Sequence, residues 1–325
     1  MRHLIGRVGF TLVAAWASLT LAFVLPRLIP GDPGSVLLAS FRGKVRPETI
    51  EAMRNVFGLS REPLASQYFN YLAAITRGDL GISISHFPAP VTNVIAGAFA
   101  WTVVLGGVAV VVSFVLGSAL GLLAAWRRGG WLDAVLPGAF TLLGALPYFW
   151  VATLAVYFLG YGAGWFPVRH AYDDALVPGW TWAFITSAAT HALLPGLTIV
   201  LASMGGWLLG MRNAAIGILQ EDFMIFARGQ GLGTRQLMRY AARAALLPNL
   251  TGFGMALGFV VSGALLTEVV FAYPGQGYLL LGAVASLDYP LIQGLYLTIT
   301  LSVLTANLLV DVIAYCLDPR LRRDA

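Results

Sequence analysis

The chain has 325 residues, of which 58% are hydrophobic and only 11% are charged. An ordinary soluble domain carries about 25% charged residues, so this composition excludes a soluble globular protein and predicts a chain that lies mostly within a lipid bilayer. The formal net charge of +5 reflects an uneven distribution of arginine along the chain, and it gives no reason to expect a nucleic-acid partner.

Six apolar runs are long enough to cross a membrane as helices, which takes about 18 residues or more. The first run exceeds the apolar core of a signal peptide and ends in PRLIPGDP without a small-residue cleavage pattern, so we expect a retained helix. Prolines within the runs, such as Pro147 and Pro195, are tolerated because neighbouring groups in a membrane protein satisfy the freed backbone. The six predicted spans cover residues 8–26, 98–126, 134–160, 192–211, 246–267 and 291–310.

The segment between the first two spans, residues 28–97, is too long to be a simple connection. Apolar residues recur in it at helical spacing, which predicts two short amphipathic helices. These helices either pack on the outer ends of the spans or form part of a dock for an extracytoplasmic partner. Their apolar faces consist of Ile50, Met53, Val56 and Phe57 in the first helix and Leu64, Tyr68, Leu72 and Ile75 in the second.

Arginine positions predict the orientation of the chain. With the N-terminus inside, the inner segments carry most of the arginines and the short outer loops carry only Arg169. Basic residues concentrate on the cytoplasmic side, so we expect both termini there. The chain then divides into a first transmembrane helix (1–27), an extracytoplasmic loop (28–97), a core transmembrane domain (98–319) with a cytoplasmic loop (212–247), and a cytoplasmic tail (320–325).

The chain shows no motif for catalysis or metal binding. Its only lysine is Lys44, and a phosphate-binding loop ending there would need glycine where Leu38 stands. The four histidines lack metal-ligand spacing, and no GxSxG element or catalytic pair of carboxylates occurs. We therefore expect a pathway, a receptor or a scaffold, and neither an enzyme nor a metal site.

A proton-coupled carrier would keep charged residues inside its spans, because burying them is costly. Glu268 and Asp311 are the candidates, but each lies near a predicted span boundary, which favours a structural ion pair or a solvated position. Hydroxyl groups in the spans are further candidates, although such groups more often pack against another helix. The candidate residues of a translocation path are Ser203, Ser262, Thr267 and Glu268.

The segment 220–248, QEDFMIFARGQGLGTRQLMRYAARAALLP, is a polar interruption on the predicted cytoplasmic side. Acidic residues at its start favour a helix N-terminus, and the glycines that follow favour a sharp break in the backbone. We expect a helix over 222–228 that exposes Phe223, Phe226 and Ala227, and a break at Gly229 and Gly231.

A second helix is predicted from Thr234 to Leu247. Its arginines recur every four residues and form one basic stripe, at Arg235, Arg239 and Arg243. A helix, a glycine break and a helix lying along the membrane form a rigid lever. An ordinary interfacial loop, with its arginines at headgroup depth, would show the same pattern.

Phrases along nearly the whole chain carry a family resemblance. EDFMIFARGQGL followed by RAALLP resembles the loop motif of permease subunits in binding-protein-dependent ABC importers, in the dipeptide, oligopeptide and nickel branch. Further phrases resemble that branch in order: LIPGDP, FGLSREPLASQY, TRGDLGIS, ALPYFW, HALLPGLTIVL, TEVVFAYPGQGYLL, LDYPLIQG and NLLVDVIAYCLDPRLR. The resemblance implies an all-α membrane protein with six transmembrane helices and the type I ABC importer permease architecture.

The resemblance also implies a coupling helix, over about 221–232, that inserts in a groove of an ATP-hydrolysing subunit. The chain departs from the resembled branch at Gly229 and Gln230, where that branch more commonly has alanine and lysine. The implied coupling residues are Glu221, Asp222, Phe223, Phe226, Ala227, Arg228, Gly231 and Leu232.

The implied role is that of a channel-forming, non-catalytic subunit in the bacterial or archaeal plasma (inner) membrane. Its expected partners are a second homologous permease, two ATP-binding subunits that hold ATP and Mg, and an extracytoplasmic binding protein, with no cofactor in this chain. Di- or oligopeptides are the favoured substrates, with nickel chelates or oligosaccharides as alternatives, and a proton-coupled secondary transporter is the alternative class. Trp165, Trp180 and Trp182 could stack on a sugar, but anchoring at the membrane interface is the favoured interpretation.

Overall fold

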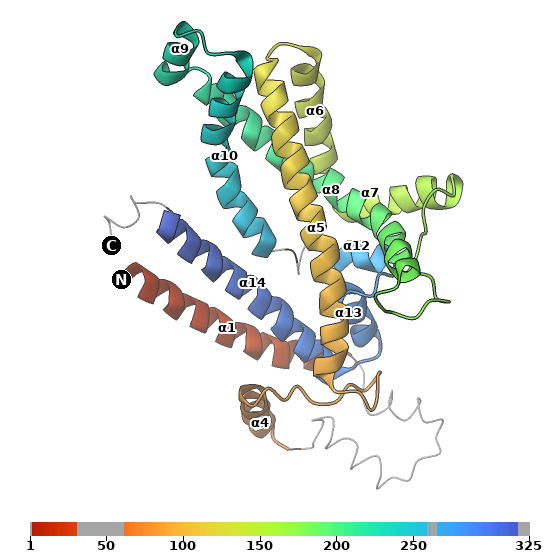
Figure 1. Cartoon of the computed structure of the whole chain (residues 1–325). Coiled ribbons are helices and arrows are strands. Elements are labelled where there is room, and N and C mark those ends of the chain that lie inside the picture. The colour runs from red at the N-terminus through yellow and green to blue at the C-terminus, as the bar shows by residue number, and fades with distance from the viewer. Residues whose placement is uncertain (1, 31–61, 259, 261–264, 318–325) are drawn as a thin grey trace. The chain divides into compact units, whose positions relative to one another are not determined.

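The computed structural model describes residues 2–30, 62–258, 260 and 265–317, and Figure 1 shows their course. Within these residues every regular element is helical and no β-strand occurs. Helices suit a lipid environment because each helix pairs its own backbone groups, which find no water there. The described part of the chain is therefore all-α, as predicted.

Four helices are long and apolar enough to cross a membrane, and they confirm four of the predicted spans. Each begins earlier in the chain than its apolar run, because the helix also includes flanking residues outside the run. The four are α1 (Arg2–Leu28), α5 (Val91–Trp126), α8 (Trp182–Ile218) and α14 (Tyr289–Leu317).

The predicted span over 134–160 is broken, so the prediction of one continuous helix is wrong there. It consists of α6 (Trp131–Ala145) and α7 (Tyr148–Ala155), which continues as the π-helix η1 (Val156–Gly162), and the two parts are bent by 96°. Pro147 causes the break, since proline disfavours helical geometry in the residue before it. Leu146 accordingly has an extended backbone with ψ of 134°.

The predicted span over 246–267 is divided between α10 (Thr234–Gly258) and α12 (Leu265–Val270). Residues 259 and 261–264 between them lie outside the described part of the chain. The described helices therefore provide four candidate spans, or five when the bent pair counts as one. The count of six stays a prediction.

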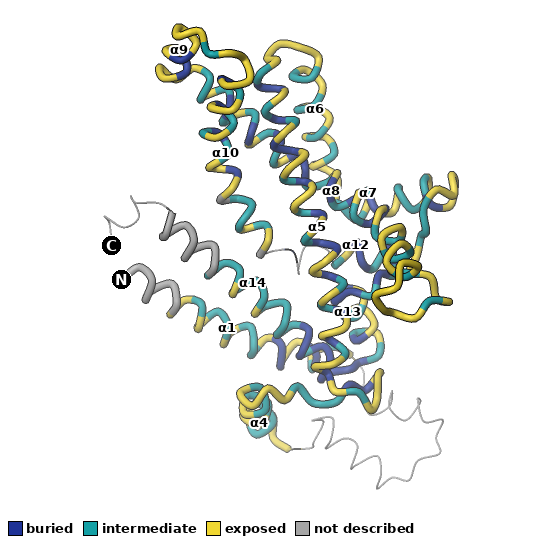
Figure 2. The backbone as a smooth tube through the Cα atoms, in the orientation of Figure 1, coloured by how far each residue is buried: buried dark blue, intermediate teal, exposed yellow. Residues whose placement is uncertain are grey.

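The helices belong to two compact units, of which unit 1 contains Met1–Thr102 and Pro274–Ala325 and unit 2 contains Val103–Tyr273. In unit 1, α1 and α13 (Gln276–Ala285) both pack on α14. Figure 2 shows the buried positions of this unit gathered at the start of α14. Its core cluster includes Val91, Ile95, Leu291, Ile292 and Leu295.

A short helix, α4 (Leu64–Thr76), packs on the C-terminal half of α1 in unit 1. The ring of Tyr68 lies 5.2 Å from that of Phe23, and its hydroxyl lies 2.7 Å from Thr20 Oγ1. Burial in the same contact raises the pKa of Tyr71 to about 12. The second predicted amphipathic helix is therefore present and packs on a span, whereas the first, near residues 47–59, lies outside the described residues.

Asp288, the residue before α14, joins two phrases that carry the family resemblance. Its Oδ2 accepts hydrogen bonds from Ser83 Oγ at 2.5 Å, from Ser85 Oγ at 2.8 Å and from the Ser85 amide at 2.9 Å. Its Oδ1 accepts a bond from the Leu291 amide at 3.1 Å, which caps the N-terminus of α14. Asp288 is fully buried, and these donors offset the cost of removing a carboxylate from water.

Unit 2 is organised around α8, to which other helices come unusually close at glycines. A Cβ atom at Gly117 of α5 would lie 2.7 Å from the Met204 carbonyl oxygen of α8, and one at Gly121 would overlap the Leu208 carbonyl oxygen. On α8 itself, a Cβ atom at Gly205 would lie 2.8 Å from the Phe140 carbonyl oxygen of α6. Small residues allow such close contact between membrane helices, so α5, α6 and α8 form one tightly packed group.

Candidate functional site

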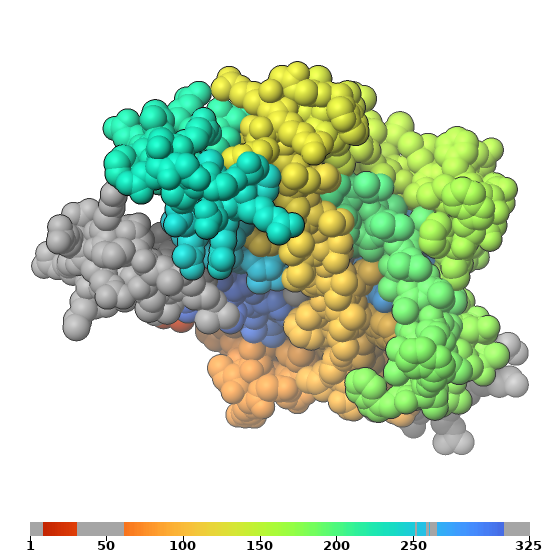
Figure 3. Space-filling view, turned by 45° about the horizontal axis from the view of Figure 1, so that its top comes forward, coloured from red at the N-terminus to blue at the C-terminus, as the bar shows by residue number. Residues whose placement is uncertain are grey.

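The polar segment forms two helices joined by a tight turn, as predicted. The first helix, α9, covers Asp222–Gly229, and α10 begins at Thr234. Helix α10 continues to Gly258, beyond the predicted end at Leu247. In the space-filling view of Figure 3, α9 and the first turns of α10 form part of the surface of unit 2.

The end of α9 is a Schellman motif, in which main-chain bonds reverse the chain after a left-handed residue. Leu232 donates its amide hydrogen to the Ala227 carbonyl at 3.3 Å, and Gly231 donates to the Arg228 carbonyl at 3.1 Å. Gly231 has a φ of 77°, which glycine adopts without the steric cost that other residues carry. The break that the sequence predicted therefore has a defined geometry.

The start of α10 is fixed in the same turn. The Gly233 amide donates to the side-chain oxygen of Gln236 at 3.3 Å, which is one half of a capping box. The Gly233 carbonyl in turn accepts a bond from the Leu237 amide at 3.1 Å. Because both helix ends are hydrogen-bonded within the turn, the angle between α9 and α10 is set by local interactions.

One side of α9 packs against α10. Met224 is fully buried and Ala227 is 9% exposed, and both belong to one buried cluster with Leu237 and Ala241. The prediction that Ala227 is exposed is wrong, because Leu232 folds back over it in the Schellman motif. The small side chain of Ala227 lets α9 and α10 approach each other. Four further side chains pack on this cluster, namely Trp126, Ile218, Leu219 and Leu232.

The opposite side of α9 presents apolar side chains to the surface. Phe223 is 48% exposed, Ile225 60% and Phe226 68%. Exposure was predicted for both phenylalanines, whereas Ile225 was missed, although it lies beside Phe226 in the sequence. Fully burying a side chain of this size contributes about 1.5–3 kcal/mol, so three of them within four residues favour association with another protein.

Charged residues surround this apolar face. Glu221 and Asp222 are exposed at the N-terminus of α9, and Arg228 is exposed in its last turn. Both placements complement the helix dipole, which was predicted for the two acidic residues only. The stripe formed by Arg235, Arg239 and Arg243 lies along α10, with Arg235 exposed at its start.

An ion pair fixes α6 to α8 in the same unit. Arg212 Nε of α8 donates to Asp133 Oδ1 of α6 at 2.6 Å, and the Gly129 amide donates to Asp133 Oδ2 at 3.0 Å. Both side chains are largely buried. The pair closes the loop after α5, which ends at Trp126 beside the α9 cluster.

Asn249 connects α10 to two other helices. Its Nδ2 donates to Ser118 Oγ of α5 at 3.3 Å and to the Trp207 carbonyl of α8 at 3.1 Å. A Cβ atom at Gly210 would lie 2.6 Å from Asn249 Oδ1, so the glycine makes room for the amide. Asn249 is buried. Through this contact the lever formed by α9 and α10 is attached to α5 and α8.

We expect Asn249→Leu to lower the midpoint of thermal unfolding by about 2–16 °C. The change removes two interhelical hydrogen bonds, each contributing about 0.6–2 kcal/mol in a membrane protein, and each kcal/mol shifts the midpoint by about 2–4 °C in a domain of 150–250 residues. Scanning fluorimetry in detergent measures the shift. Ser203→Ala is the control, because Ser203 Oγ bonds only carbonyls of its own helix. Equal midpoints for the two variants would contradict the role given to Asn249.

The described residues among those predicted to line a path come from two helices, Ser203 from α8 and Thr267 and Glu268 from α12. Ser203 Oγ donates to the Ile199 carbonyl of its own helix at 2.7 Å, and Ser262 lies outside the described residues. Thr267 and Glu268 are fully buried in α12, so the solvated position considered for Glu268 is wrong. Thr267 Oγ1 has no hydrogen-bond partner among the described residues. These residues stay candidates for a transport role.

The chain is similar to known transport proteins of the membrane. Residues 117–323 match the family described as "Binding-protein-dependent transport system inner membrane component". The probable D,D-dipeptide transport system permease protein DdpB of Escherichia coli K12 is 32% identical over 97% of this chain and 95% of its own length. The dipeptide transport system permease protein DppB of Lactococcus lactis is 27% identical over 99% of both chains. The di/tripeptide transport system permease protein DppB of Pseudomonas aeruginosa is 29% identical over 97% of both.

Proposed function

Because the chain belongs to the family of binding-protein-dependent transport system inner membrane components, we propose that it is the channel-forming permease subunit of an ATP-driven importer, coupled to its motor through α9. The observation that supports this most directly is the apolar face of Phe223, Ile225 and Phe226, which is exposed on a helix held rigidly by the rest of unit 2. A rigid helix with an exposed apolar side suits insertion into a groove of another protein.

The proposal includes the full assembly. This chain, with six spans and both termini in the cytoplasm, pairs with a second homologous permease, with two subunits that bind ATP and Mg, and with an extracytoplasmic binding protein. The membrane is the bacterial or archaeal plasma membrane. In this proposal residues 1–27 and 98–319 cross the membrane, 28–97 lie outside the cell membrane, and the loop 212–247 and the tail 320–325 lie in the cytoplasm.

Transport follows from differential affinity. ATP binding favours the closed arrangement of the motor subunits, and a conformational equilibrium shifts only when the two states bind the ligand unequally. Movement of the motors displaces α9, and the packing of α9 on α10 passes the displacement to the bundle. The chain changes its conformation and performs no chemistry.

The proposed substrates are di- or oligopeptides. The relatives named above are described as transporting dipeptides, D,D-dipeptides and di/tripeptides. Nickel chelates and oligosaccharides remain the alternative cargoes of the same class of importer. Mass spectrometry of the ligand that co-purifies with the partner binding protein distinguishes them.

Replacing Phe226 with aspartate tests the coupling role. The change places a charge at the centre of the apolar face, where a single anchor side chain typically contributes about 2 kcal/mol or more to binding. We expect at least about a tenfold loss of ATP-driven peptide uptake in proteoliposomes and loss of the ATPase subunits on co-purification. Membrane insertion should be retained, because Phe226 lies on the surface.

Phe69→Asp is the matched control, since Phe69 is also 68% exposed and lies on α4. It should leave uptake and co-purification unchanged. Equal uptake by the Phe226 and Phe69 variants would contradict the coupling role of α9. Uptake that proceeds without any ATPase and collapses with the proton gradient would instead establish a secondary transporter.

A further inference from the structure

Loop 163–181, between η1 and α8, is fixed in place by hydrogen bonds. The His170 amide donates to the Phe271 carbonyl at 3.1 Å, and the Asp173 amide donates to Ser187 Oγ of α8 at 2.9 Å. The Tyr172 and Phe184 rings pack with their centroids 5.1 Å apart. The loop is therefore attached to the first turns of α8 at two successive residues, and to Phe271 through His170.

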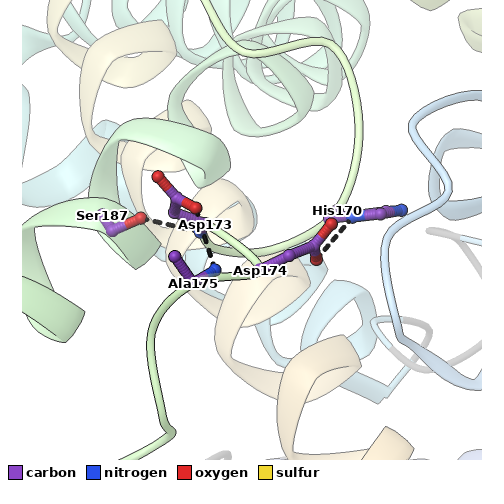
Figure 4. Close-up of polar contacts among 5 residues, drawn as sticks. All are labelled: His170, Asp173, Asp174, Ala175 and Ser187. Atoms are coloured by element: carbon purple, nitrogen blue, oxygen red, sulfur yellow. Dashed lines mark hydrogen bonds and ion pairs between the residues drawn. The ribbon is translucent and has the colours of Figure 1, made fainter.

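The conformation of the loop is also supported internally, as Figure 4 shows. Asp173 Oδ1 accepts a bond from the Ala175 amide at 3.0 Å, and His170 Nδ1 lies 2.9 Å from Asp174 Oδ1. His170 has a left-handed φ of 65°, which this local network holds. Exposed ion pairs contribute little to stability. The main effect of these interactions is therefore to define the conformation of the loop.

This ordered loop and the start of α8 nevertheless expose large apolar side chains. Trp180 is 97% exposed, Val177 83%, Trp182 78% and Trp165 72%. Tryptophan is among the residues most enriched at the energetic centres of protein interfaces. An aromatic surface that is already ordered also binds at a lower entropic cost than one that must fold on contact.

The length of α8 places this surface outside the membrane. Its 37 residues extend over roughly 55 Å at about 1.5 Å per residue, compared with about 30 Å for the hydrocarbon core. The ion pair of Arg212 with Asp133 belongs at the edge of that core. About 20 residues are needed to cross from Arg212 to the other edge, near Ala192.

Trp182 then lies about 15 Å beyond the far edge of the core. The headgroup layer is only about 5–8 Å thick on each side. A typical helix tilt of about 20° changes the number of residues needed to cross the hydrocarbon core by about one. The first turns of α8 also carry Thr186, Ser187 and Thr190, as expected for a helix in water. This depth opposes the interpretation of Trp180 and Trp182 as interfacial anchors.

We propose that loop 163–181 and the first turns of α8 form a docking surface for the extracytoplasmic binding protein, which it engages through Trp180 and Trp182. The inference rests on the proposed function, which supplies the partner and places this end of α8 on the outer side. Asp173 and Asp174 are exposed on the same loop, and Arg169 is its only arginine. The partner surface is therefore an apolar patch bordered by basic side chains, since complementary charge speeds association and selects the partner.

The test measures binding of the partner binding protein to the assembled transporter in lipid nanodiscs. We expect Trp180→Ala to raise the dissociation constant at least about tenfold, the effect of losing a central aromatic anchor. Trp182→Ala should act in the same direction. Replacing Asp173 and Asp174 together with asparagine should mainly slow association and weaken its dependence on salt.

Trp131→Ala is the control, because Trp131 is 68% exposed and begins α6 on the side proposed to be cytoplasmic. It should leave the dissociation constant unchanged. Unaltered affinity in both the Trp180 and Trp182 variants would overturn the docking surface, and so would strong quenching of Trp180 fluorescence by brominated lipids, which would make it a membrane anchor. If the unmodified chain assembles with no ATPase and binds no binding protein, the importer proposal itself fails.

Discussion

Replacing Gly231 with valine is expected to reduce ATP-driven uptake by at least about tenfold while the chain still inserts in the membrane. Gly231 has a φ of 77°, and a residue with a side chain in this region costs roughly 1–2 kcal/mol, more when it is β-branched. A Cβ atom added at Gly231 would have no atom within 4 Å, so the effect arises from backbone strain and not from a clash. Relieving the strain opens the Schellman turn and changes the direction of α9.

A graded series of substitutions at Gly231 distinguishes backbone strain from the effect of side-chain size alone. Asparagine tolerates the left-handed region better than alanine, and alanine better than valine, so uptake in proteoliposomes should fall from the unmodified chain through Gly231→Asn and Gly231→Ala to Gly231→Val. Gly229→Ala is the matched control, because Gly229 is helical and a Cβ atom there would also have no atom within 4 Å. Equal uptake by the Gly231→Ala and Gly229→Ala variants would refute the role of the turn.

Replacing Gly121 with valine is expected to separate α5 from α8. A Cβ atom at this position would overlap the Leu208 carbonyl oxygen and lie 3.1 Å from the Arg212 amide nitrogen. Backbone atoms cannot move aside as a side chain can, and overpacking of this kind typically costs about 1–3 kcal/mol or more. We expect the thermal midpoint to fall by about 5 °C or more.

Gly107→Val is the control for this change, since Gly107 lies on the same helix with no atom within 4 Å of a Cβ position. The two variants share the helix propensity cost of valine and differ only in what the side chain meets. Scanning fluorimetry and the monodispersity of the detergent-solubilised protein measure the difference. Similar losses in both would show that propensity, and not close packing, governs stability here.

The sequence predicted the helices around the site because its signals are local. Acidic residues before α9, glycines after it and arginines at helical spacing in α10 each act within a few residues. The burial of Ala227 was missed because it depends on the bond from the Leu232 amide, which turns the chain back over the helix. The break at Pro147 was missed for a related reason, since apolarity alone does not distinguish a straight span from a bent one.

Contacts between distant residues could not be predicted. Asn249 reaches Ser118 across 131 positions of the chain, and Asp288 reaches Ser83 across 205. Neither pairing leaves a periodic pattern in one sequence, because each is set by how whole helices pack. The exposure of Trp180 could not be predicted either, since a tryptophan shortly before a predicted span is also typical of a membrane interface.

The turn between α9 and α10 is held almost entirely by main-chain hydrogen bonds. Its shape is held by main-chain atoms of Phe226 to Leu232 and by the side-chain amide of Gln236, so the side chain of Gln230 takes no part in it. Residues with other side chains can therefore replace Gly229 and Gln230 without removing any of these hydrogen bonds. Under the proposed function, substitutions at Gly229 and Gln230 would therefore change the surface offered to an ATPase subunit without changing the geometry of the turn that holds α9.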